Sequence, residues 1–448
     1  MYLMPDQSHG PALLSTSIQY GIVARSHLLT GKVLKGYVGA STTNVGNGNP
    51  NIEFTPNISA CAVTTEGWTA KCIWGYGNGE VAMTIGSRIM DAGRTQSRHI
   101  RCRVTDEHVG RISDVIWATG NAAALSAGAD GTVRIWDAKH LACLWILLDD
   151  EGLVPDPCIN VVADLEHGVI IATKESGSAV IWKGQFDVSP NFFVNTQINT
   201  IRPALRIPPP STSVSPANVR RPVKLFLDPY SSGQSFGILY DDDDVFYRVT
   251  IELQALTWDR TTFKGGPLGP LTVLFPSFTA SDEGESVVLA GDRLGRVSFF
   301  SWRGLSSTSA DGATFIPSFG RLDAQDDGAI TAIACNSHVI VTGSARGTTR
   351  VWDLLNLRLL RSFPSPAAKP SVGREWDPVS NILLERDLLV ISVGSRVMTW
   401  KADPVKPHKA VKVKHTARNR GNGTAKWHSA RSRYSFLLLT LIGAFQSA

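Results

Sequence analysis

The sequence predicts an all-β repeat protein whose short strands stack into a closed array. Two segments carry this prediction: SAGADGTVRIWD over residues 126–137, and its echo TGSARGTTRVWD over residues 342–353. Each reads as two short apolar strands that are joined by a glycine-containing turn and end in Trp-Asp. A hairpin unit that cannot bury its own apolar face needs stacked neighbours, and worn copies of the same pattern recur along the chain.

Composition agrees with this fold class. The 448 residues are 43% hydrophobic and 19% charged, with 40 glycines and 24 prolines. That balance suits many strands joined by turns and disfavours a helical bundle. The six cysteines lie apart with no CxxC spacing, so they predict neither a disulfide framework nor a zinc site. The N-terminus does not read as a secretory signal, and we expect a cytoplasmic or nuclear protein.

Seven stretches follow one pattern, an apolar strand, a small-residue hairpin and a strand that ends in an aromatic residue. They are residues 58–85, 111–137, 158–183, 223–249, 271–302, 329–353 and 379–401. The fourth stretch, which contains ILYDDDDVFYRVT, keeps the hairpin outline without Trp-Asp. Residues 184–221 contain IRPALRIPPPSTSVSP, and this proline-rich composition predicts a flexible loop between the third and fourth copies.

These copies resemble the WD-repeat family, whose members fold as β-propellers. The resemblance implies a hydrogen-bonded tetrad in the second copy, formed by His108, Ser126, Asp130 and Trp136, with Asp137 completing the Trp-Asp pair. The chemistry is reasonable, because an indole N–H and a buried imidazole each need a partner and a linked network fixes the turn.

The sixth copy departs from the family pattern. It keeps Thr342 and the pair Trp352 and Asp353, but Arg346 stands where the family has an aspartate. Asp327 lies near the position of the family's histidine. The resemblance therefore implies a broken tetrad in this copy.

The predicted architecture is a single seven-bladed WD-repeat β-propeller over residues 58–401. An N-terminal segment, 1–57, precedes it, and a basic tail over 402–448 is expected to be disordered. Residues 26–37 resemble residues 352–363, so a strand near 31–37 is expected to pair with the last copy and close the ring. The alternative is that this start is the remnant of a preceding helical module.

The tail concentrates positive charge. Residues 401–433 contain ten lysines and arginines against one acidic residue, Asp403. Such a segment could bind nucleic acid or act as a nuclear-import signal, and an inert basic extension fits equally well. Residues 436–445, FLLLTLIGAF, would span about 15 Å as a helix, about half of a bilayer core, so we expect no membrane anchor.

No motif predicts catalysis, a metal or a cofactor. The chain has no GxSxG, GxxxxGK[ST] or HExxH, and its histidines do not cluster at ligand spacing. The glycine-rich residues 75–80 and the aspartates 241–244 read as turns rather than as phosphate or calcium sites. The resemblance makes Arg293 a candidate partner-binding residue, because family members that read phosphorylated segments place arginine before this turn. A lone rim arginine is the alternative.

We therefore expect a non-catalytic scaffold that acts as a monomer within a complex and binds other proteins. The degenerate copies and long insertions resemble fungal-type F-box/WD-repeat proteins. That resemblance implies a substrate-recognition subunit of a cullin-type ubiquitin ligase, although residues 1–57 contain no F-box. The alternative is a nuclear or nucleolar assembly factor whose basic tail contacts RNA or chromatin.

Overall fold

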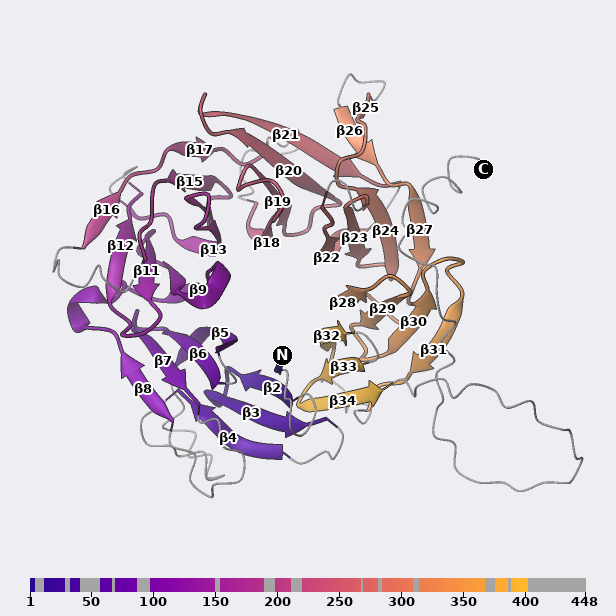
Figure 1. The fold of residues 1–448 in the computed structure, drawn as a ribbon. Coiled ribbons are helices and arrows are strands. Elements are labelled where there is room, and N and C mark those ends of the chain that lie inside the picture. Colours follow the sequence, from indigo (N-terminus) through magenta and orange to yellow (C-terminus); the bar gives the residue numbers. More distant parts are fainter. Residues whose placement is uncertain are drawn as a thin grey trace, which may run out of the picture.

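The structure, a computed structural model, shows a ring of eight β-sheets (Figure 1). It describes residues 1–4, 12–28, 33–40, 57–66, 69–86, 97–149, 154–188, 198–210, 220–266, 269–280, 284–308, 314–366, 375–385 and 388–401. The predicted all-β propeller is confirmed, but the prediction of seven blades is wrong, because the ring has eight.

The first four blades cover residues 2–207. Blade 1 contains β1 (Tyr2–Met4), β2 (Ala12–Ser17), β3 (Ile22–His27) and β4 (Val33–Gly39). Blade 2 contains β5 (Ile58–Glu66), β6 (Thr69–Tyr76), β7 (Val81–Ile85) and β8 (Arg98–Arg101). Blade 3 contains β9 (Ile112–Trp117), β10 (Ala123–Gly128), β11 (Val133–Asp137) and β12 (Cys143–Leu147), extended by β16 (Asn199–Ile201). Blade 4 contains β13 (Cys158–Asp164), β14 (Val169–Lys174), β15 (Ala179–Lys183) and β17 (Leu205–Ile207).

The other four blades cover residues 222–401. Blade 5 contains β18 (Pro222–Leu227), β19 (Ser235–Tyr240), β20 (Val245–Glu252) and β21 (Thr257–Lys264), extended by β26 (Thr314–Pro317) and β25 (Ser307–Thr308). Blade 6 contains β22 (Leu271–Ser277), β23 (Val287–Asp292), β24 (Arg296–Ser301) and β27 (Gly320–Asp323). Blade 7 contains β28 (Ile330–Cys335), β29 (Val339–Ser344), β30 (Thr349–Asp353) and β31 (Leu359–Phe363). Blade 8 contains β32 (Val379–Glu385), β33 (Leu388–Val393) and β34 (Arg396–Lys401).

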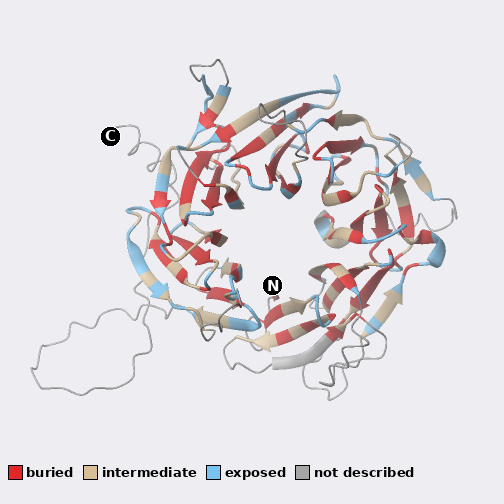
Figure 2. Ribbon diagram, turned by 180° about the vertical axis from the view of Figure 1, so that it is seen from behind, coloured by how far each residue is buried: buried red, intermediate tan, exposed pale blue. Residues whose placement is uncertain are grey.

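The second strand of most blades is buried along its whole length. β10, β14, β19, β23 and β29 each consist entirely of buried residues, because a neighbouring blade covers each face of the sheet. Such strands read as continuous apolar or small-residue runs, as in VIIATK of β14. Figure 2 shows this buried layer within each blade and exposed residues on the loops and outer strands.

Eight hydrophobic clusters hold the ring together, one at each junction between neighbouring blades. Seven of them contain ten or more buried residues. The seam between blade 8 and blade 1 is smaller: among the described residues it buries Leu13, Leu388 and Val390, with partly buried side chains around them. Side-chain packing therefore closes the ring there.

The extra blade is the N-terminal one, which lies within the segment expected to precede the propeller. Its outer strand, β4, pairs with β3, with Val38 opposite Val23. The expected pairing of residues 33–37 with the last copy is therefore wrong. The strand completes its own sheet instead, since β3 offers a free edge directly before it in the chain.

The prediction of a flexible loop over residues 184–221 is wrong for its middle. β16 pairs in parallel with β12, and β17 pairs antiparallel with β15, with Leu205 opposite Ile181. β17 supplies the outer strand that β15 would otherwise lack, and the prolines that follow it end the pairing. Residues 189–197 and 211–219 lie outside the described residues.

The basic tail, residues 402–448, also lies outside the described residues, and so does the apolar segment 436–445. Within the described ranges, no helix is both long and apolar enough to cross a membrane.

Candidate functional site

The turn of blade 3 carries a continuous hydrogen-bond network. The Trp136 indole N–H donates to Ser126 Oγ at 2.8 Å, and Ser126 Oγ lies 2.7 Å from His108 Nε2. On the other side of the ring, His108 Nδ1 lies 3.0 Å from Asp130 Oδ1. Asp130 also accepts from the backbone N–H groups of Thr132 and Val109, both at 3.0 Å. The four residues that the sequence resemblance assigned to a tetrad therefore lie together, and the network fixes both the turn and the preceding loop.

Burial and hydrogen bonding set the charge state of this network. Burial lowers the pKa of His108 and favours the neutral ring. For Asp130, burial alone would raise the pKa, but the bonds from His108 and Thr132 outweigh it and hold the pKa well below its usual range. A neutral His108 that donates from Nδ1–H to the carboxylate and accepts at Nε2 from Ser126 satisfies every member.

The aspartates of both Trp-Asp pairs act on the next turn. Asp137 Oδ2 accepts from the backbone N–H of His140 at 2.7 Å, and Asp353 Oδ1 accepts from that of Leu355 at 2.8 Å. Each aspartate thus holds the backbone of the turn that leads to the outer strand of its blade. Their role is therefore structural.

The network of blade 7 differs from the expected one. Trp352 donates to Thr342 Oγ1 at 3.1 Å, and Gln325 Nε2 donates to the same oxygen at 3.0 Å. Gln325 therefore occupies the place of the histidine, which the sequence interpretation had put near Asp327. Asp327 instead accepts from Ser344 Oγ at 3.2 Å. The hydrogen-bond network of blade 7 stops at Gln325, because Arg346 supplies no acceptor at the turn.

Blade 2 holds a related network that the sequence did not reveal. Trp74 donates to Thr84 Oγ1 at 3.1 Å, and Thr84 Oγ1 lies 3.0 Å from His99 Nδ1. The tryptophan here lies on β6 and the hydroxyl on β7, the reverse of blade 3. Because the strands are exchanged, a search for a terminal Trp-Asp pair passes over it.

Exposed side chains gather in the two loops beside the blade 3 turn. Val104, Val109 and Val154 are 82%, 80% and 79% exposed, and Arg103 and Arg111 are exposed in the first of these loops. The first loop, between β8 and β9, is held against the turn through the Val109 N–H bond to Asp130. We call these five residues the blade 3 rim surface.

The second loop, between β12 and β13, is also held against the blade 3 turn. Gly131 adopts a φ of +74°, and a Cβ there would lie 3.0 Å from the carbonyl oxygen of Asp156. Glycine is therefore needed at this position both for the turn and for the approach of the loop. The turn and the loop that carries Val154 form one continuous piece of the rim.

Arg293 lies on the corresponding turn of blade 6 and is already engaged. Its Nη1 is 3.0 Å from Asp242 Oδ1 on the turn of blade 5, and both side chains are more than half exposed. A carboxylate therefore neutralises the guanidinium that was the candidate anion receptor. Asp242 belongs to the run of aspartates 241–244, which forms the β19–β20 turn.

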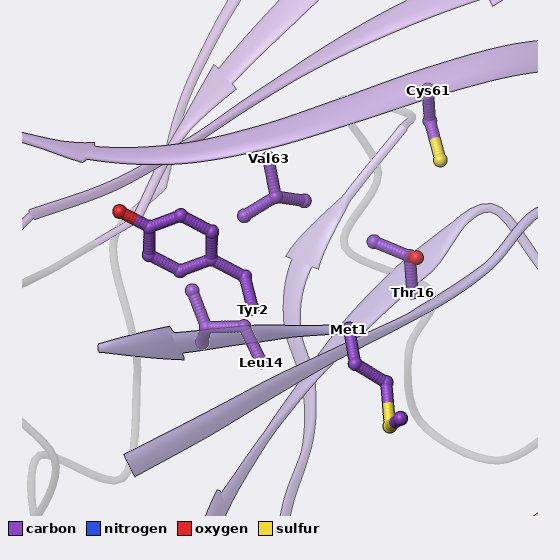
Figure 3. A pocket seen from close by; sticks show the side chains of 6 residues that line it. All are labelled: Met1, Tyr2, Leu14, Thr16, Cys61 and Val63. Carbon is purple, nitrogen blue, oxygen red and sulfur yellow. The ribbon is translucent and has the colours of Figure 1, made fainter. Parts of the chain in front are cut away.

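A cavity of about 210 Å³ lies between blades 1 and 2 and is lined by Met1, Tyr2, Leu14, Thr16, Cys61 and Val63 (Figure 3). Its thiol is that of Cys61, and burial raises the pKa of this thiol, so it stays protonated near neutral pH. The Thr16 hydroxyl and the amino group of Met1 favour the ionised thiol, but burial outweighs both.

No cluster of metal ligands was found among the described residues: no group of three or more His, Cys, Asp or Glu side chains could hold an ion. Within the same ranges all six cysteines are free thiols. The exposed groups of the rim offer binding contacts, namely apolar side chains and guanidinium groups.

Comparisons with known proteins agree with the ring. The family model "WD domain, G-beta repeat" (WD40) matches residues 100–137 and 318–353, which contain the two Trp-Asp copies. Among solved structures, the chain is similar to the computationally designed Ika8 protein, with a TM-score of 0.56, 16% identity, and coverage of 89% of this chain and 95% of that chain. The WD40 β-propeller domain of Doa1 matches with a TM-score of 0.43 and 12% identity over 77% of this chain and 92% of that domain. No curated protein matches the chain.

The likeness to Ika8 supports the fold, and the two matched segments agree with the resemblance of the sequence to WD repeats. WD40 propellers are typically non-catalytic scaffolds that bind other proteins. The chain therefore carries two WD40 repeats, which lie within a closed ring of eight blades.

Proposed function

We propose that this protein is a non-catalytic scaffold that captures a segment of another protein on the blade 3 rim surface. The observation that carries the proposal is the exposure of Val104, Val109 and Val154, each close to 80%, in two adjoining loops. Single exposed apolar residues are ordinary, but a group of them on one rim is typical of a contact surface.

The charges beside the valines suggest what the partner segment carries. Arg103 and Arg111 are exposed next to Val104 and Val109. Guanidinium groups form paired hydrogen bonds with carboxylates and guide an acidic partner during association. We therefore expect a segment that combines apolar side chains with aspartate or glutamate.

The network of blade 3 would make this surface stiff. Val109 is held through its backbone by Asp130, which His108 and Thr132 hold in turn. A loop that is ordered before binding loses less conformational entropy in the complex. This is the role that we assign to the tetrad in binding.

We further propose that the captured protein is a substrate for ubiquitin transfer and that this chain is the recognition subunit of a cullin-type ligase. The support is the resemblance of its degenerate copies and long insertions to fungal-type F-box/WD-repeat proteins. The proposal places the protein in the cytoplasm or the nucleus, where such ligases act.

The test is a comparison of two sets of substitutions on the full chain. One variant carries Val104→Ser, Val109→Ser and Val154→Ser, and the control carries Leu305→Ser, which removes a leucine that is 92% exposed after β24. The expected result is that crosslinking and mass spectrometry recover cullin and adaptor subunits and a shared substrate with the unmodified chain. The triple variant should lose the substrate and keep the ligase subunits.

Two results would contradict these proposals separately. If the triple variant keeps every partner that the Leu305→Ser control keeps, the rim surface is not the binding site. If the substrate is lost but no ligase subunit is ever recovered, the scaffold proposal stands and the ligase proposal fails.

A second function rests on the charge of the tail. Ten lysines and arginines against one aspartate over residues 401–433 favour a nuclear or nucleolar assembly factor that contacts RNA or chromatin. Binding of single-stranded RNA by the full chain should then weaken steeply as salt rises and disappear when residues 401–433 are deleted. Equal binding by the deleted chain would exclude this function.

A further inference from the structure

The turn between the third and fourth strands is built in the same way in blades 3, 5 and 7. In each of these blades an acidic residue ends the third strand, three residues follow it, and a leucine comes next. The leucines are Leu141, Leu256 and Leu357, with φ angles of +56°, +53° and +52°. A left-handed backbone strains any residue that carries a Cβ, so a leucine at this position needs a compensating contact.

Burial supplies that contact in two of the three blades. Leu141 is 1% exposed and belongs to the hydrophobic cluster between blades 2 and 3. Leu357 packs against the cluster between blades 6 and 7. Leu256 of blade 5, in contrast, is 47% exposed. Because burial of its side chain offsets little of the strain, the stability of the fold does not explain a leucine in the turn of blade 5.

Leu256 is exposed because its hairpin is longer than the corresponding ones. β20 contains eight residues, whereas the third strands of the other seven blades contain five or six. Pairing continues past Thr250 and Asp259, and the end of the hairpin projects at the edge of the ring (Figure 1). Residues 254–259 are all exposed in consequence. We call residues 252–259 the blade 5 tip.

Trp258, two residues after Leu256, is held in place from one side. The guanidinium of Arg260 lies over the Trp258 ring, 5.1 Å from its centroid, and also over the Tyr247 ring at 5.9 Å. Arg260 in turn donates to the carbonyl oxygen of Pro208. Trp258 is nevertheless 36% exposed. A tryptophan that is positioned before binding is typical of the residues that dominate protein interfaces.

Two carboxylates give the blade 5 tip a negative charge. Glu252 and Asp259 are both exposed, and neither forms an ion pair with a described residue. They lie on one face of the hairpin, because Glu252 is opposite Thr257 and alternate residues of a strand share a face. Arg248 lies further down the same face, but it is half-buried and donates to other groups. The tip is therefore suited to a partner that carries positive charge.

We propose that the blade 5 tip is a docking element that inserts into an apolar pocket of another folded protein, edged by lysine or arginine. Leu256 and Trp258 enter the pocket, and Glu252 and Asp259 pair with the basic side chains at its edge. The tip is convex, so shape complementarity requires a concave partner rather than an extended segment. The strain at Leu256 is then retained for binding and not for stability.

The blade 5 tip and the blade 3 rim surface lie at opposite ends of their blades. The rim surface borders the turn between the second and third strands, whereas the tip joins the third strand to the fourth. Successive antiparallel strands turn at alternate ends of a sheet. The two surfaces can therefore be occupied at the same time, and this inference does not depend on the proposed function.

The first test separates a structural leucine from a binding leucine. Leu256→Gly relieves the left-handed strain and loses little burial, so the unfolding midpoint in denaturant should equal or exceed that of the unmodified chain. Leu141→Gly is the matched control and should lower the midpoint, because it removes a buried side chain from the same kind of turn. If both variants lower the midpoint equally, Leu256 supports the fold and the proposal is overturned.

The second test identifies the partner with the full chain. A benzophenone photocrosslinking amino acid replaces Gln254 and, in the control chain, Lys139, the exposed residue at the same position in the turn of blade 3. Irradiation is done in cells that express the protein naturally. The expected result is a protein that is crosslinked from position 254 and not from position 139, at an apolar pocket edged by lysine or arginine.

The affinity of that purified protein for the full chain then tests each part of the tip. Leu256→Ser with Trp258→Ser should weaken binding at least about tenfold. Glu252→Lys with Asp259→Lys should also weaken it at least about tenfold, and the loss should shrink as salt rises. The control Leu355→Ser, which removes a 44% exposed leucine from the turn of blade 7, should leave the affinity unchanged.

Three further outcomes would overturn the proposal. If position 254 captures nothing that position 139 does not, the tip is not a docking element. If the captured protein is a second copy of this chain, the tip serves self-association instead. If the affinity tolerates the charge reversal, the pocket has no basic edge.

Discussion

Blades 3 and 7 use the same tryptophan bond and differ in everything beyond it. In both, an indole N–H donates to a hydroxyl on the second strand, Ser126 or Thr342. In blade 3 the hydroxyl continues through His108 to Asp130 and fixes the turn. In blade 7 the hydrogen-bond network ends at Gln325, and the buried Oε1 of Gln325 has no hydrogen-bond partner among the described residues. The tryptophan–hydroxyl bond between two strands can therefore form without the histidine–aspartate interaction that fixes the turn.

The largest expected effect is on the tryptophans. Trp136 is fully buried and Trp352 is 8% exposed. Replacement of Trp136 by alanine should lower the free energy of unfolding by about 4 kcal/mol, and Trp352→Ala should lower it by about 3 kcal/mol. Both substitutions leave a cavity, but only Trp136→Ala also removes a hydrogen-bond partner from the buried network of blade 3. Denaturant unfolding measures both values. Equal losses would show that the network adds nothing to packing.

The next effect concerns the residues behind the hydroxyl. His108→Ala should cost about 2–3 kcal/mol, because it leaves Ser126 and Asp130 buried without their partner. Gln325→Ala should cost only about 1 kcal/mol, because it removes two bonds from Nε2 to Thr342 but also removes a buried oxygen that has no partner. The thermal unfolding midpoint would rank the two variants. A larger loss for Gln325→Ala would reverse our comparison.

The inner strands of the two blades differ in one buried carboxyl group, and the pH dependence of stability should show this difference. Asp114 lies opposite Ala127 in blade 3, where blade 7 has Ala332 opposite Gly343. Burial raises the pKa of Asp114 to about 6, although its carboxylate accepts the Val161 N–H at 3.1 Å. In the unfolded chain this carboxyl titrates near ~3.9.

The sign of the pH effect follows from these two values. Between about pH 4 and pH 6 the folded protein keeps a proton that the unfolded chain releases, so Asp114 lowers stability as the pH rises through that window. Relative to the unmodified chain, Asp114→Asn should therefore gain up to about 2 kcal/mol between pH 4 and pH 7. Unfolding at the two pH values measures the gain. A difference that stays constant with pH would contradict the prediction.

The smallest effect is expected at Arg293. Its ion pair with Asp242 is exposed on both sides, and such pairs contribute little to stability. Arg293→Ala should change the free energy of unfolding by less than about 0.5 kcal/mol, as measured by denaturant unfolding. A larger loss would show that the turns of blades 5 and 6 support each other.

The sequence predicted the fold class and seven of the blades, because each of those copies keeps a hairpin whose strands carry at least one aromatic residue. It missed blade 1, whose strands ALLSTS and IVARSH carry no aromatic residue and no Trp-Asp. It placed the partner of Thr342 near Asp327 rather than at Gln325, since a glutamine can replace a histidine only when the geometry brings its amide to the hydroxyl. The exposure of Val104, Val109 and Val154 carries no signal in sequence, because valine is usual in a buried strand.

The small seam between blades 1 and 8 can form only late in the synthesis of the protein. Leu13 packs in this cluster against Leu388 and Val390, which are synthesised some 375 residues later. At about 5–20 residues per second, a ribosome needs roughly 20 to 80 s to extend the chain from residue 13 to residue 388. Blade 1 is therefore the first blade synthesised and the last to be sealed. During that interval its uncovered face is the part of the nascent protein that a chaperone would have to protect.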